Sequence, residues 1–238
     1  MDLAASAAAI GALADPVRRA LYQHVVAQPE GVGREQAATA VGVPAHTAKF
    51  HLDRLADEGL LDVEFRRLSG RTGPGAGRPA KLYRRAAREL AVSLPERHYD
   101  LAGHILASAL ERVGEGEPWE AALHGAARDE GLRTAASAAP TAAPSTPADD
   151  ATPPAELARL AGVLAQQGYE PHAEPADIVL TNCPFDALAA RHTALVCGLN
   201  VDYVQGLADG LECPDARAHL DPAEGRCCVR VTAEAAPA

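Results

Sequence analysis

The chain has 238 residues, of which 47% are apolar and only 4% aromatic, and its formal net charge is −10. This length fits one large domain or two smaller ones, and the apolar content is sufficient for packed cores. No apolar run approaches the roughly 20 residues that a membrane-spanning helix needs, and the chain does not begin like a signal peptide. We therefore expect a cytoplasmic protein with no membrane partner, whose thiols stay reduced.

The charge is divided unevenly along the chain. Residues 1–88 hold 13 Lys and Arg against 9 Asp and Glu, whereas residues 89–238 hold 9 against 23. A basic head on an acidic body favours an anionic partner for the head. An Arg-rich solvated surface would give the same counts, so charge alone does not decide between the two interpretations.

Three short helices are predicted near the start of the chain. The first begins at Asp15, a capping residue that is followed by a proline suited to the first helical turn. The second is expected from Arg34 to about Ala40, and the third between Pro44 and Gly59. A tight Val-Gly-Val turn joins the second helix to the third, which is the pattern of a helix-turn-helix.

A strand, a glycine-rich basic loop and a second strand follow the third helix. The alternation of Leu61, Val63 and Phe65 predicts a half-buried strand, and the stretch AKLYRR resumes an extended pattern at residues 80–85. The loop GRTGPGAGRP between them, residues 70–79, is too rich in Gly and Pro for a regular element. This order of elements is that of the hairpin wing of a winged helix.

The third helix is expected to enter the DNA major groove with the face opposite its core residues Ala48, Leu52 and Leu55. Candidate DNA-contacting residues on this helix and on the wing are His46, Thr47, Lys49, Phe50, Arg66, Arg67, Arg71, Arg78 and Lys81. Phe50 has two interpretations, contact with a thymine methyl group or packing in the core. Asp53 also points outward, and we expect it to pair with a neighbouring Arg.

Beyond the wing, residues 95–113 predict a helix with an apolar stripe formed by Leu101, Ile105, Leu106, Leu110 and Val113. A second helix is expected within residues 118–132. Packing onto the head would explain the stripe, but a two-fold operator requires a two-fold protein, so we favour dimerisation. Residues 134–154, rich in Ala, Pro, Thr and Ser, predict a flexible linker.

The last part of the chain predicts a small α+β domain. A leucine-rich helix should end at Gly168, and a short apolar strand should end near Cys183. A longer helical stretch follows, with a break expected near Gly198. Two extended runs flank the turn sequence DPAEG at residues 221–225, which predicts an antiparallel hairpin.

All five cysteines lie in the last quarter of the chain, at Cys183, Cys197, Cys213, Cys227 and Cys228. The absence of a Cys-x2-Cys pair argues against a zinc ribbon, whereas thiols from separated elements favour an iron–sulfur cluster. Burial as small core residues would explain the cysteines equally well. If the last two lie on one strand, only one of them can face a cluster, because alternate strand residues face opposite sides.

Two sets of motifs resemble known families. The stretches LADPVRRALYQHV, AATAVGVPAHTAKFHLDRLADEGLL and GRTGPGAGRPAKLY resemble the winged-helix repressors of the ArsR-like group over about residues 10–88. The stretches NCPF, HTALVCGLN and DPAEGRCCV are similar to the sensor domain of the Suf-operon repressors, ArsR-like regulators of iron–sulfur assembly genes. The resemblance implies a cluster, expected to be [4Fe-4S], on Cys183, Cys197 and one of Cys227 or Cys228, with Cys213 as a candidate fourth ligand.

The sequence therefore predicts an α+β protein with an N-terminal winged helix-turn-helix domain at residues 1–88. A helical dimerisation region at 89–133, the linker at 134–154 and a smaller α+β sensor domain at 155–238 should follow. We expect a homodimeric regulator, a repressor, that binds double-stranded operator DNA under the control of the cluster.

The main alternative is a winged-helix regulator without a cluster, which senses a metal ion, thiol oxidation or a small ligand. An enzyme is not expected, because the chain lacks a Ser/His/Asp grouping and a phosphate-binding glycine loop.

Overall fold

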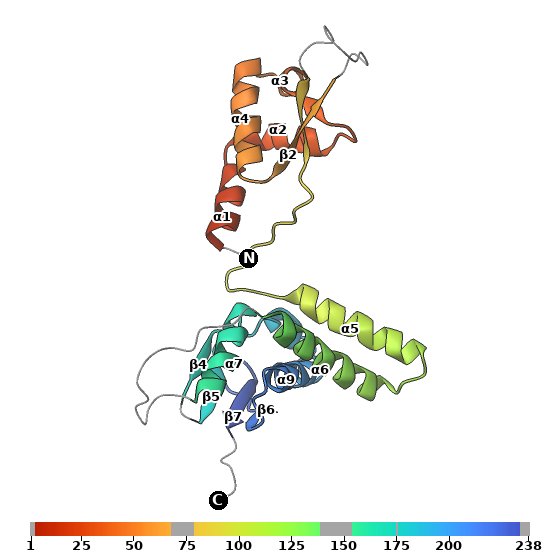
Figure 1. The fold of residues 1–238 in the computed structure, drawn as a ribbon, viewed down its shortest axis with the longest axis vertical. Coiled ribbons are helices and arrows are strands. Elements are labelled where there is room, and N and C mark those ends of the chain that lie inside the picture. The colour runs from red at the N-terminus through yellow and green to blue at the C-terminus, as the bar shows by residue number, and fades with distance from the viewer. Residues whose placement is uncertain (1–2, 68–78, 139–153, 175, 234–238) are drawn as a thin grey trace, which may run out of the picture. The chain divides into compact units, whose positions relative to one another are not determined.

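The computed structural model describes residues 3–67, 79–138, 154–174 and 176–233. The chain divides into two compact units, Met1–Val92 and Ser93–Ala238, each with its own hydrophobic core (Figure 1). Most of the predicted linker, residues 139–153, and the wing residues 68–78 lie outside the described residues.

The N-terminal unit begins with four helices, α1 (Leu3–Ala12), α2 (Pro16–Val26), α3 (Arg34–Val41) and α4 (Ala45–Asp57). Asp15 caps α2, because its carboxylate accepts a hydrogen bond of 2.8 Å from the backbone N–H of Arg18. Gly42 ends α3 in the left-handed conformation, with φ of 75°, and turns the chain into α4. The three helices predicted around the turn are confirmed, and α1 was not anticipated.

A three-stranded antiparallel sheet in the order β1-β3-β2 completes this unit, with β1 at Val32–Gly33, β2 at Leu61–Arg66 and β3 at Ala80–Arg85. The winged helix-turn-helix is therefore confirmed. The expected alternation along β2 holds only at Leu61, which is buried, since Val63 and Phe65 are 36% and 66% exposed. Because β2 is an edge strand that leaves the helices as it runs towards the wing, its later residues have no core to face.

The C-terminal unit contains five helices in its described residues, α5 (Tyr99–Gly114), α6 (Trp119–Ser137), α7 (Ala155–Gln166), α8 (Asp186–Ala189) and α9 (Thr193–Gly210). Its antiparallel sheet has the order β4-β5-β7-β6, with strands Pro171–Ala173, Asp177–Leu180, Val229–Ala233 and Ala216–Leu220. The predicted hairpin around DPAEG is thus confirmed as β6 and β7. The break expected near Gly198 is wrong, because α9 continues through it and its neighbours Cys197 and Leu199 are buried.

Helices α6 and α9 lie side by side with their backbones in contact (Figure 1). A Cβ atom on Gly206 would lie 2.2 Å from the carbonyl oxygen of Arg128, and one on Gly131 would lie 2.3 Å from that of Tyr203. An ion pair of 2.5 Å between Arg128 and Asp209 flanks this contact. Most of the helical region predicted at residues 89–133 therefore belongs to the same unit as the cysteines. Helix α6 also extends into the predicted linker, as far as Ser137.

Helix α5 packs on α6 through small side chains rather than through the whole predicted apolar stripe. Ala102, Ile105 and Ala109 are buried, whereas Leu110 is 62% and Val113 37% exposed. Ile105 and, in part, Leu101 and Leu106 pack against the core, so only Leu110 and Val113 of the predicted stripe are left exposed. The result is an uncovered apolar strip on α5.

Replacing Gly206 with Ala should destabilise the C-terminal unit by about 1–3 kcal/mol or more, because the added Cβ meets the backbone of α6. The matched control is Gly198→Ala in the same helix, where a Cβ would meet nothing within 4 Å. This control should stabilise α9 by about 0.5–1 kcal/mol through helix propensity. Urea unfolding followed by fluorescence of Trp119, the one tryptophan of the chain, measures both. Equal stability of the two variants would contradict the close packing.

Candidate DNA interface and thiol quartet

The outward face of α4 presents a mixed polar and aromatic surface. His46 and Lys49 are exposed and Thr47 is partly buried. Phe50 is 65% exposed and contacts the ring of His51 edge-on, so it lies outside the core. The polar and aromatic candidates on α4 are therefore available to a ligand in a groove.

The described part of the wing adds further cations and a second aromatic side chain. Arg66 pairs with Glu30 at 2.8 Å, and Arg67 is exposed. Phe65 lies opposite Lys81 in the register of β2 and β3, and its exposure was missed because the alternation of β2 placed it inward. The other two wing candidates, Arg71 and Arg78, lie outside the described residues.

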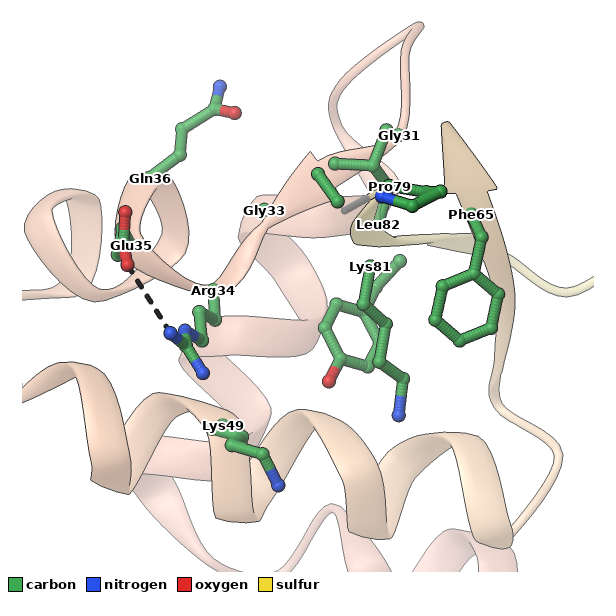
Figure 2. A pocket seen from close by; sticks show the side chains of 12 residues that line it. Gly31, Gly33, Arg34, Glu35, Gln36, Lys49, Phe65, Pro79, Lys81 and Leu82 are labelled. Atoms are coloured by element: carbon green, nitrogen blue, oxygen red, sulfur yellow. Dashed lines mark ion pairs between the residues drawn. The ribbon is translucent and has the colours of Figure 1, made fainter. Parts of the chain in front are cut away.

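A pocket of about 660 Å³ opens between the start of α3, the middle of α4 and the strands of the wing (Figure 2). Its walls carry the cations Arg34, Lys49 and Lys81 beside the apolar side chains of Phe65 and Leu82. Arg34 begins α3 and pairs with Glu35 at 3.5 Å. Sequence reasoning did not select Arg34, although it stands at the start of a predicted helix of the helix-turn-helix.

Asp53 accepts three hydrogen bonds, of which the two from Lys81 and Tyr83 join α4 to β3. Its Oδ2 accepts from Lys49 Nζ at 2.7 Å, while its Oδ1 accepts from Lys81 Nζ and from the Tyr83 hydroxyl, each at 2.6 Å. Burial alone would raise the pKa of Asp53, but the bonds from Lys49, Lys81 and Tyr83 lower it below its usual value. The expected Arg partner is wrong, because the partners are two lysines and a buried tyrosine.

Four thiols gather in the C-terminal unit. Cys183 follows β5, Cys197 lies on α9, and Cys227 and Cys228 directly precede β7. The thiols of Cys183 and Cys227 are hydrogen-bonded, as are those of Cys197 and Cys228, and the two pairs interact electrostatically. We call these four residues the thiol quartet.

The two adjacent cysteines lie directly before β7 rather than in it, and Cys227 is buried whereas Cys228 is partly exposed. They occupy a bend in which the Cys227 N–H donates to the Leu180 carbonyl at 2.8 Å and the Cys228 carbonyl accepts from the Asp221 N–H at 2.7 Å. Cys227 has the Cys183 thiol as its neighbour, and Cys228 has that of Cys197.

The thiols of the quartet differ in their pKa values. A hydrogen bond from the Cys227 thiol lowers the pKa of Cys183, and the same bond together with burial raises the pKa of Cys227. Burial and the neighbouring Cys228 raise the pKa of Cys197 to about 12. Cys183 is thus the favoured thiolate of its pair.

A buried polar network supports the quartet. The Asn200 amide donates to Cys227 Sγ at 3.5 Å, and the Tyr169 hydroxyl donates to the Asn200 carbonyl oxygen at 2.5 Å. The backbone N–H of Val229 also donates to Cys227 Sγ at 3.5 Å. Both Asn200 and Tyr169 are almost fully buried. Sequence reasoning missed them, although an Asn inside an apolar helix, three residues after Cys197, is a signal of a buried partner.

Cys213 lies apart from the quartet. Its buried thiol donates to the Glu156 carbonyl at 3.5 Å and accepts from Arg159 at 3.9 Å, both on α7. Burial raises the pKa of Cys213. These contacts with α7 are those of a core cysteine.

The four thiols of the quartet are of the ligand type that iron–sulfur clusters use. Among the described residues, no three His, Cys, Asp or Glu side chains converge closely enough to hold one metal ion. Iron–sulfur clusters take cysteine thiolates from separate elements and are tuned by N–H donors to sulfur. Four thiols from three segments, with Asn200 and Val229 as donors to one of them, have this composition.

Residues 13–64 match the family model of a helix-turn-helix domain, a span that covers α2, α3, α4 and the start of β2. Together with the wing, this match defines the N-terminal unit as a winged helix-turn-helix and indicates a DNA-binding transcriptional regulator. The chain has no significant match among curated proteins. In the described part of the chain, no helix has the length and hydropathy to cross a membrane.

Brief treatment of the native protein with iodoacetamide should label Cys183 well before Cys197 and Cys213, because Cys183 is less buried and its pKa is lowered. Peptide mass spectrometry after digestion measures the label at each position. The protein unfolded in urea is the control, since all five thiols should then react alike. Labelling of Cys213 as fast as Cys183 in the native protein would contradict the arrangement.

Proposed function

We propose that the protein is a homodimeric transcriptional repressor whose operator binding is controlled by an iron–sulfur cluster, [4Fe-4S], held by the thiol quartet. The observation that carries the proposal is the gathering of four thiols in a chain whose N-terminal unit is a winged helix-turn-helix. When bound, the cluster would supply a centre sensitive to oxidants and to iron supply.

The N-terminal unit supplies the DNA contacts. His46 and Lys49 present N–H donors from α4 to base edges or phosphates, and Phe50 presents an apolar ring to a thymine methyl group. Arg66 and Arg67 leave β2 towards the wing and approach the phosphate backbone. In this arrangement α4 selects sequence, and the wing fixes the position of the domain on the duplex.

The four cysteines of the quartet would supply the sulfur ligands of the cluster. Cys183 is the thiol most easily ionised in its pair, and the donors Asn200 and Val229 stabilise negative charge on Cys227. Cys197 lies on α9, whose backbone contacts α6 at Gly131 and Gly206. One of the four ligands, Cys197, thus lies on a helix that packs against α6.

The apolar strip on α5 supports a dimer. Leu110 and Val113 are exposed on a helix that packs on α6 through its opposite side. A second copy of the chain would cover this strip, and two winged helices would then match a two-fold operator.

Anaerobic reconstitution with iron and sulfide tests the cluster. Cys183→Ser and Cys197→Ser should each lose most bound iron and sulfide and the visible absorbance, because a serine hydroxyl is a poor iron ligand. Cys213→Ser is the matched control, since this buried thiol lies apart from the quartet, and it should keep the parent's content. Full iron and sulfide in both quartet variants would overturn the cluster and leave a regulator that senses thiol oxidation, a metal ion or a small ligand.

Leu110→Glu should convert the dimer to a monomer, because the charge would be buried without a partner in the interface. Sedimentation equilibrium of the full chain measures the mass. Leu220→Glu, at a leucine that is 50% exposed on β6, is the control and should leave the mass unchanged. A Leu110→Glu chain with the parent's dimeric mass would show that the interface lies elsewhere.

A further inference from the structure

The surface proposed to face DNA carries a carboxylate, Asp53, between two of its lysines. Asp53 lies on the outward face of α4, one turn after Lys49, and binds both Lys49 and Lys81. The two lysines occupy facing walls of the pocket between α4 and the wing strands (Figure 2). Neither residue is therefore a free cation in the unbound protein.

The side chains of Lys49, Lys81 and Asp53 differ in how far they are exposed to solvent. The side chains of Lys49 and Lys81 are 51% and 37% exposed, whereas that of Asp53 is 26% exposed. The carboxylate and its bond to the buried Tyr83 hydroxyl belong partly to the fold, whereas the two lysine ammonium groups can be reached by a ligand.

We propose that Asp53 is a specificity-determining residue, which holds Lys49 and Lys81 back from the phosphates of arbitrary DNA and leaves Lys49 competent to contact bases in the operator. The inference rests on the proposed DNA-binding function and extends it to the discrimination between operator and random sequence.

The physical reason is a difference in what the two kinds of DNA offer. Random duplex attracts the protein through phosphates alone, and a phosphate that approaches either lysine also approaches the Asp53 carboxylate, which repels it. In the operator, base acceptors in the major groove add to the phosphates. The Lys49 ammonium has three N–H donors, so it can keep its bond to Asp53 and still donate to a guanine. Asp53 therefore penalises random DNA more than the operator.

Asp53→Asn separates this role from a structural one. The Asn side chain has the same shape, and its oxygen still accepts a hydrogen bond from the buried Tyr83 hydroxyl, so no buried donor loses its partner. The substitution removes the negative charge and replaces the oxygen that accepts from Lys49 with an NH2 group, so Lys49 is released. Circular dichroism and thermal unfolding of the full chain verify that the fold is kept.

The experiment measures binding to two labelled duplexes by fluorescence anisotropy across a series of NaCl concentrations. One is a random-sequence duplex, and the other is the sequence that the parent protein enriches from a random pool. Asp53→Asn should bind the random duplex about 3–10-fold more tightly, with a salt slope steeper by about 1, as one further phosphate contact implies. Its affinity for the selected sequence should change by less than about 2-fold, because the base contacts are retained. The ratio of the affinity for the selected sequence to that for the random duplex should therefore fall.

The control is Asp62→Asn, which removes the same charge from the same unit at an aspartate that pairs with Arg84 at 3.8 Å, across β2 and β3. It should leave the operator preference at the parent's value. An equal gain for Asp62→Asn, or unchanged or weaker binding of random DNA by Asp53→Asn, would overturn the role of Asp53. A parent protein that binds no duplex would overturn the proposed DNA binding itself, which the parent's titration shows separately.

Discussion

The C-terminal unit depends on the close approach of α6 and α9, which glycine alone permits. At Gly131 and Gly206 any side chain would meet the backbone of the opposite helix. This contact fixes α9, and α9 in turn carries Cys197 and the buried Asn200. The same contact places α6, and with it α5, in the unit that contains the cysteines. The position of one thiol and the orientation of the uncovered strip on α5 therefore follow from the same packing.

Around α9, the thiol quartet shows how a protein interior accommodates reactive sulfur. Cys227 is buried, but the amide of Asn200 and the N–H of Val229 donate to its sulfur, and the Tyr169 hydroxyl satisfies the other side of Asn200. Such a network costs free energy unless each polar group has a partner. Cys213, bonded to backbone carbonyls and an arginine of α7, shows the contrasting environment of a cysteine used for packing.

The surface of the winged helix carries both cations and a carboxylate that partly neutralises them. Cations from α3, α4 and β3 surround one pocket, while Asp53 neutralises part of their charge and ties α4 to the wing strand. Two exposed aromatic rings, Phe50 and Phe65, flank this charged surface. A protein that must find one site among many gains from limiting its attraction to phosphates, because specificity is a difference between two affinities.

Local signals in the sequence determined the three helices of the helix-turn-helix. These signals are the capping residue Asp15, the turn residue Gly42 and the helical spacing of Ala48, Leu52 and Leu55. The same holds for the β6–β7 hairpin. Tertiary structure alone decided which thiols meet, which side of α5 is buried and which partners Asp53 takes. These depend on contacts between segments far apart in sequence, such as the close approach of the backbones of α6 and α9, which the periodicity of a single element does not determine.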